Sequence, residues 1–126
     1  MKIEEVARLL NATVHYIPEG YDVDITYAGA SDLMSDVLAY VAHDILQITG
    51  LLSPQVIRTA SLMGISAVLF TRGKIPTQEI IDAAKDAKVA VLSTSLKTFS
   101  TCGRLYCAGI HSIDGDTYEG KGLDCQ

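Results

Sequence analysis

Apolar residues recur along the chain in two alternating patterns. A spacing of three and four residues predicts a helix that ends at Asn11 and buries Ile3, Val6, Ala7 and Leu10. The same spacing predicts further helices at residues 33–43, 54–63, 78–88 and 96–110. Short apolar or alternating runs between them predict strands at residues 13–17, 24–30, 44–49, 65–71 and 89–94.

Residues at the predicted boundaries support this division. Ser53, followed by a proline, is typical of a helix start, and Gly64 suits the position just beyond the end of the same helix. Thr77 is a second predicted N-cap. The run at 65–71 is the most continuously apolar, which indicates a central strand covered on both faces, whereas 13–17 alternates like an edge strand. The alternation predicts an α/β fold with a mainly parallel sheet flanked by helices.

The 126 residues correspond to one domain, and we place it at residues 1–111. From residue 112 the sequence becomes polar, acidic and glycine-rich, so residues 112–126 are predicted to be a tail outside the core.

The charge, the apolar runs and the cysteines of the sequence limit the kinds of partner and compartment that we expect. A net charge of −5 argues against nucleic acid or an anionic membrane as the main partner. No apolar run approaches the roughly 18 residues that a membrane span needs, and Met1 leads directly into a mixed pattern. The three cysteines, Cys102, Cys107 and Cys125, fit a reducing compartment better than a disulfide framework. A cytoplasmic domain is therefore predicted.

Hydroxyl groups, glycines and one arginine gather where the predicted parallel strands end. Open parallel sheets bind ligands beyond the carboxyl ends of their strands, and a guanidinium can bind two phosphate oxygens at once. The sequence thus predicts an anion or nucleotide site at Ser31, Asp32, Thr49, Gly50, Thr71, Arg72, Gly73, Ser93 and Thr94.

A second interpretation of the same residues is structural. Ser, Thr and Asp are preferred helix caps, and each of these groups precedes a predicted helix. Arg72 separates the two interpretations, because a cap needs no guanidinium. Both stay open from the sequence.

Other candidate chemistry is weaker. Cys102, Cys107 and His111 hint at a soft metal site, but no CxxC is present and a packed thiol is the simpler interpretation. Ser31 and Asp32 could form a nucleophile and a base, yet no nearby histidine or lysine activates the serine. No phosphate-binding GxxxxGK[ST] loop occurs either. We therefore predict no metal, no cofactor and no enzymatic activity.

Three motifs carry a family resemblance: "SDLMSDVL" after the second predicted strand, "TG" at 49–50, and "TRG" at 71–73 with a proline after it. With the order of the elements, they make roughly residues 1–110 similar to the DRTGG domain family, which includes stand-alone proteins labelled HPr-serine-kinase-like after that enzyme's N-terminal domain. Thr71 and Gly73 match the threonine and the last glycine of the family signature. Arg72 stands at the middle glycine, and the signature's Asp-Arg pair is not present.

The resemblance implies an α/β sandwich with a mainly parallel sheet and a regulatory or assembly role. Such domains occur beside nucleotide-sensing CBS domains in some pyrophosphatases and inside bacterial phosphotransacetylases. The P-loop domain that does the catalytic work of HPr kinase has no counterpart in this sequence, so a serine-kinase label would be inherited from a neighbour.

Two functions are therefore considered. The first is a non-catalytic regulatory module that binds a small anionic metabolite or an adenine nucleotide, as a homodimer. The alternative is an interaction or scaffold domain of a larger metabolic enzyme system, with an enzyme partner and no small ligand.

Overall fold

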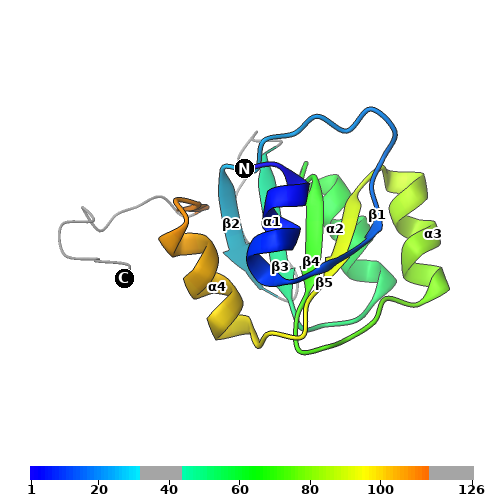
Figure 1. The fold of residues 1–126 in the computed structure, drawn as a ribbon. Helices are drawn as coiled ribbons and strands as arrows, with labels where there is room; N and C mark the ends of the chain where they lie inside the picture. The colour runs from blue at the N-terminus through cyan, green and yellow to red at the C-terminus, as the bar shows by residue number, and fades with distance from the viewer. Residues whose placement is uncertain (32–43, 114–126) are drawn as a thin grey trace.

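A six-stranded sheet forms the centre of the computed structural model, which describes residues 1–31 and 44–113 (Figure 1). The strand order is β1-β5-β4-β3-β2-β6; β1 is antiparallel to its neighbour, and the other strands pair in parallel. The strands are β1 (Thr13–Tyr16), β2 (Tyr27–Ala30), β3 (Ile45–Thr49), β4 (Ala67–Phe70), β5 (Ala90–Ser93) and β6 (His111–Ser112). The predicted mainly parallel α/β fold is confirmed.

Helices cover both faces of this sheet. They are α1 (Ile3–Leu10), α2 (Pro54–Leu62), α3 (Gln78–Ala87) and α4 (Thr98–Cys107). Figure 1 shows α1 in front of the sheet and α2 behind it. None of the helices in the described residues is long and apolar enough to span a membrane.

Each face of the sheet has its own apolar core, because successive strand residues point to opposite sides. On β4, Leu69 joins the cluster under α1 and α4, and the next residue, Phe70, joins the cluster under α2 and α3. All four residues of β4 are buried, as the continuous apolar run predicted for a central strand.

Local signals explain most of the element boundaries. Asn11 ends α1 in a left-handed conformation, with φ of 49°. Ser53 accepts a hydrogen bond from the backbone of Gln55 at the start of α2, and Thr77 does the same for Ile80 in α3. These three boundary predictions are confirmed.

Two predictions near the end of the chain are wrong. The last helix was expected to run from residue 96 to 110, but α4 begins at Thr98 and ends at Cys107. The chain then turns at Gly109, whose φ is 102°, and β6 pairs in parallel with β2. The sheet therefore includes Ser112, which was assigned to the tail, and residues 114–126 lie outside the described residues. The predicted helix at 33–43 also lies outside them.

Candidate functional site

The carboxyl ends of β2, β3, β4 and β5 meet at one edge of the sheet, the lower edge in Figure 1. A hollow of about 280 Å³ opens at this edge, lined by Ala30, Ser31, Ile48, Thr49, Gly50, Arg72 and Thr98. The hollow thus brings together four residues predicted from the sequence: Ser31, Thr49, Gly50 and Arg72. Asp32 lies outside the described residues.

The threonine hydroxyls at this edge hold the loops in place. Thr49 Oγ1 accepts a hydrogen bond from the backbone of Leu51 at 3.0 Å. The fully buried Thr71 donates to the carbonyl of Thr49 at 3.4 Å, and its Oγ1 lies 2.8 Å from Oγ1 of Thr98. Thr71, which directly follows β4, therefore joins this strand end to β3 and to the start of α4.

The helix-cap interpretation is wrong for the residues that follow β3, β4 and β5. Loops separate these strand ends from their helices, and the N-cap positions of α2, α3 and α4 belong to Ser53, Thr77 and Lys97. Because other residues occupy the N-cap positions, the hydroxyls of Thr49 and Thr71 form hydrogen bonds with the backbone at the end of β3 and in the loop after it instead.

Ser93 and Thr94 face away from the hollow. Thr94 donates a hydrogen bond to the carbonyl of Leu10 at 2.8 Å, which ties β5 to the end of α1. Ser93 Oγ lies 2.6 Å from His15 Nε2 on β1, and burial lowers the pKa of this histidine. Neither predicted residue lines the hollow.

The Thr71-Arg72-Gly73 turn has an unusual backbone. Arg72 and Gly73 both have positive φ, at 65° and 72°, and this is uncommon for a residue with a side chain such as Arg72. The backbone N–H of Arg72 donates to Leu96 O at 2.8 Å, and that of Gly73 donates to Thr94 O at 2.9 Å. The amide of Gly73 is therefore used within the protein, and the turn is fixed to the connection between β5 and α4.

This turn directs the Arg72 side chain toward β3. Its Nη2 donates to the carbonyl of Gly50 at 3.2 Å, so the guanidinium bridges the loops that follow β4 and β3. Of the described residues that line the hollow, Arg72 is the one that carries a charge. The arrangement can bind an anion, because a guanidinium has five N–H donors and Gly50 takes a bond from one of its nitrogens.

Three lining residues were not predicted from the sequence: the apolar Ala30 and Ile48, and the polar Thr98. The helical spacing placed Thr98 inside the last helix, whereas it is the first residue of α4. The hydroxyl-rich run "STSLKT", which begins at the last residue of β5, was the available signal, because such residues favour turns and helix starts.

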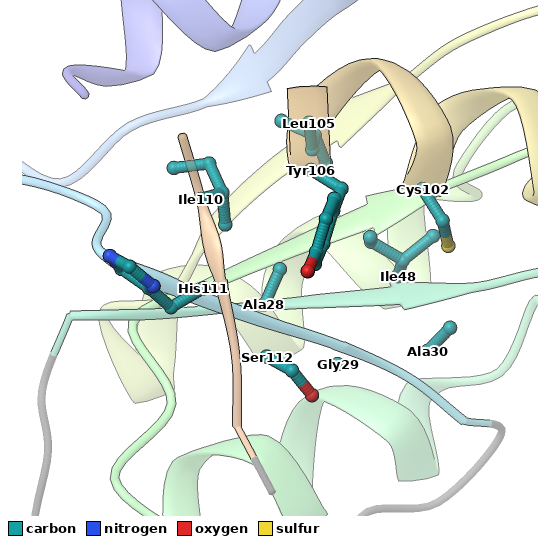
Figure 2. Close-up of a pocket in the computed structure, with 10 residues that line it drawn as sticks. All are labelled: Ala28, Gly29, Ala30, Ile48, Cys102, Leu105, Tyr106, Ile110, His111 and Ser112. Atoms are coloured by element: carbon teal, nitrogen blue, oxygen red, sulfur yellow. The ribbon is translucent and has the colours of Figure 1, made fainter. Parts of the chain in front are cut away.

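A second, apolar pocket of about 200 Å³ lies between α4 and the β2–β6 edge (Figure 2). It is lined by Ala28, Gly29, Ala30, Ile48, Cys102, Leu105, Tyr106, Ile110, His111 and Ser112. Burial raises the pKa of the Cys102 thiol, so this cysteine favours its neutral form. Ala30 and Ile48 also line the Arg72 hollow, so the two cavities are neighbours.

A third depression of about 490 Å³ lies between α2 and α3. Its charged lining is mainly acidic, with Glu79, Asp82 and Asp86 beside Arg58, and such a lining does not favour an anion. Within residues 1–31 and 44–113, no group of three or more His, Cys, Asp or Glu side chains could hold a metal ion.

The sheet and the hollow place the molecule among the open, mainly parallel α/β domains, in which ligand sites lie beyond the carboxyl ends of the strands. A family model of the DRTGG domain matches residues 5–107. The chain therefore belongs to the DRTGG domain family, as its sequence motifs predicted.

A solved structure has a similar fold: the CBS and DRTGG domains of the regulatory region of Clostridium perfringens pyrophosphatase, complexed with the activator diadenosine tetraphosphate. The two share 20% sequence identity with a TM-score of 0.66, and the match covers 80% of this chain and 44% of that one. This chain thus spans less than half the length of the pyrophosphatase region. No curated protein matches the chain significantly.

Proposed function

We propose that this DRTGG domain is a non-catalytic regulatory module that binds a small anionic metabolite, an adenine nucleotide in particular, in the hollow at Arg72. The position of the Arg72 guanidinium carries the proposal, because it holds a positive charge at the carboxyl edge of the sheet with no carboxylate among the described lining residues. A phosphate placed there gains charge-assisted hydrogen bonds, which are about twice as strong as neutral ones.

The choice of an adenine nucleotide rests on the similar pyrophosphatase region, whose activator is diadenosine tetraphosphate. That region contains CBS domains as well as a DRTGG domain, so the transfer to this chain is our inference. The family itself supports the regulatory role more than the identity of the ligand.

The hydroxyls at the site favour binding over catalysis. Thr49, Thr71 and Thr98 bond to one another or to the backbone, so their hydroxyls hold the loops around the hollow. A ligand that engages Arg72 acts on a turn bonded to Leu96 and Thr94, so binding is coupled to the connection between β5 and α4.

The proposed self-association or docking on a partner enzyme would use apolar side chains at the surface. Leu62 on α2 is 86% exposed and Phe99 on α4 is 90% exposed, at two separate positions. We propose a homodimer in the cytoplasm; the free thiols of Cys102 and Cys107 agree with a reducing compartment.

Ligand-induced stabilisation tests the proposal. At 100 times its Kd, a ligand of the folded state adds roughly 2.7 kcal/mol of stability, which raises the Tm by several degrees in a domain of this size. We expect this shift with ATP, ADP or pyrophosphate. Arg72→Ala should weaken binding more than tenfold, since a charged hydrogen bond of about 1.5–3 kcal/mol is lost.

Arg58→Ala is the matched control, because Arg58 is an exposed arginine beside the acidic depression on α2 and α3. It should leave the affinity for ATP unchanged. Equal losses in the two variants would indicate a general charge effect and remove Arg72 from the site. If no anion or nucleotide binds the wild-type protein, the scaffold alternative is favoured, and a stoichiometric enzyme partner would support it.

A further inference from the structure

Gly50 follows β3 at the edge of the hollow, and its backbone does not require a glycine. It is absent from the glycines with positive φ, which include Gly20, Gly64 and Gly73. Its lack of a side chain therefore needs another explanation.

The explanation lies in the space where a side chain would be. A Cβ added to Gly50 would lie 2.6 Å from Nη2, 2.9 Å from Nε and 3.0 Å from Cζ of Arg72. Cβ atoms essentially never approach another heavy atom this closely, and the atoms in the way are the far end of the Arg72 side chain, so a side chain at position 50 moves the guanidinium rather than the backbone. The guanidinium thus lies over the α-carbon of Gly50 while its Nη2 bonds to the carbonyl of the same residue.

We infer that Gly50 is the positioning residue of the Arg72 site: its missing side chain forms a seat that fixes the guanidinium. Arg72 is then held at two points, by its backbone N–H on Leu96 O and by its Nη2 on Gly50 O. The seat is a feature of the protein itself, and its use in binding an oxyanion rests on the function proposed above.

A seated guanidinium has a defined plane, and this defines the chemical class of ligand. Two of its N–H groups can reach two oxygens of one phosphate or pyrophosphate group at once, and the bond to Gly50 O restricts the exposed side chain before the ligand binds. A lysine would not reproduce this, because its ammonium is a point charge without a planar fork.

Gly50→Ala tests the seat, with Gly103→Ala as the matched control. Gly103 lies in α4, where an added Cβ meets nothing within 4 Å. We expect Gly50→Ala to weaken ATP binding, measured by calorimetry, at least tenfold, and Gly103→Ala to leave it unchanged. In an Arg72→Ala background, Gly50→Ala should have no further effect, because the two substitutions remove the same arrangement.

A second readout needs no ligand. The Nε–H resonance of Arg72, assigned by its loss in Arg72→Ala, should shift in Gly50→Ala and stay in place in Gly103→Ala. An unchanged resonance would overturn the seat, whatever the binding data show. A shifted resonance with no ATP binding by the wild-type protein would keep the seat and reject the proposed function.

The double variant, Gly50→Ala with Arg72→Ala, keeps the inference testable if Gly50→Ala alone does not fold. If Gly50→Ala alone does not fold, then Gly50→Ala combined with Arg72→Ala should fold, because the displaced group is gone. Failure of both, with Arg72→Ala folded, would show that Gly50 has a backbone role and would overturn the inference.

Discussion

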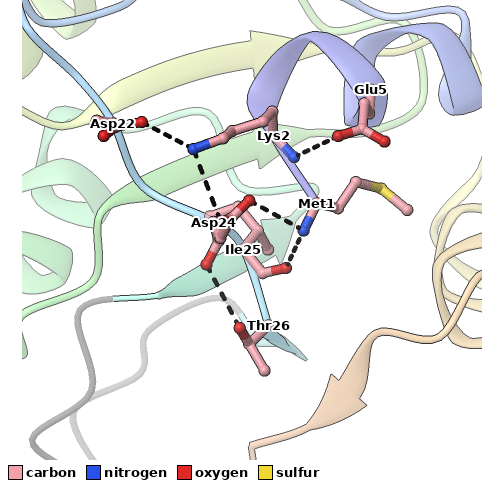
Figure 3. Close-up of polar contacts among 7 residues, drawn as sticks. All are labelled: Met1, Lys2, Glu5, Asp22, Asp24, Ile25 and Thr26. Carbon is pink, nitrogen blue, oxygen red and sulfur yellow. Dashed lines mark hydrogen bonds and ion pairs between the residues drawn. The ribbon is translucent and has the colours of Figure 1, made fainter.

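The two edges of the parallel sheet use polar groups in different ways. At the amino edge, charged groups lie on the surface and pair with one another: Lys2 Nζ is 2.7 Å from a carboxylate oxygen of Asp22 and 3.7 Å from one of Asp24 (Figure 3). At the carboxyl edge, buried hydroxyls such as that of Thr71 bond to neighbouring loops, and the charge of Arg72 faces a carbonyl.

The polar groups of the two edges are expected to contribute differently to the stability of the fold. Exposed ion pairs contribute little, because water and salt screen them and both side chains lose freedom when they pair. Buried hydroxyl groups contribute more, since breaking their bonds leaves polar atoms without water. The carboxyl edge therefore combines buried, hydrogen-bonded hydroxyls with an arginine that has further N–H donors, whereas Lys2 at the amino edge pairs with Asp22 and Asp24.

The largest effect is expected from Thr71→Val, which keeps the shape of the side chain and removes its hydroxyl. The carbonyl of Thr49 and the hydroxyl of Thr98 each lose a contact. The free energy of unfolding should fall by about 1–3 kcal/mol, measured by urea denaturation. Thr71→Ser keeps the hydroxyl and should lose less; equal losses in the two variants would mean that the methyl group, not the hydrogen bonds, is what matters.

An intermediate effect is expected at His15, which is partly buried beside Ser93. Burial lowers the pKa of His15, so the unfolded chain binds a proton at a higher pH than the folded protein does. Stability should therefore fall as the pH drops below about 6.5 and level off below the folded pKa. A His15→Gln variant should lose this part of the pH dependence in urea midpoints between pH 5 and 7.5; an unchanged profile would contradict the assignment.

The smallest effect is expected from Lys2→Met at the amino edge. Hydrogen bonding to Asp22 raises the pKa of Lys2, and the bond to Lys2 lowers the pKa of Asp22. The pair is thus present at neutral pH; it is lost as the pH falls through the lowered pKa of Asp22 or rises through the raised pKa of Lys2. At pH 7 we expect a small decrease in the Tm that 0.5 M salt removes. If Lys2→Met lowered the free energy of unfolding as much as Thr71→Val does, the two edges would not differ in their contribution to stability.

The sequence predicted the fold well where each element has its own local signal. Ser53, Gly64 and Thr77 mark helix ends by their own chemistry, and the apolar run around β4 indicates a buried central strand. It failed at β6, because two residues have no periodicity and Ile110 continued the helical spacing past the true end of α4.

For the site, the sequence indicated the correct edge of the sheet but not the role of each residue. It selected Arg72 and Gly50 from their positions after strands, and both line the hollow. It could not show that Thr94 bonds to Leu10 or that Gly50 makes room for a guanidinium, because these contacts join residues far apart in the chain. These contacts depend on tertiary packing, which the spacing of residues along the sequence does not show.

An amide-resonance titration with ATP tests most directly whether a phosphate-bearing ligand binds at the Arg72 hollow, as we propose. We predict that the shifts concentrate on Gly50, Arg72 and Thr98, and that they disappear in Arg72→Ala. Shifts centred instead on Gly29 and Tyr106, in the apolar pocket of Figure 2, would contradict the proposal, as would a spectrum that does not change at saturating ATP.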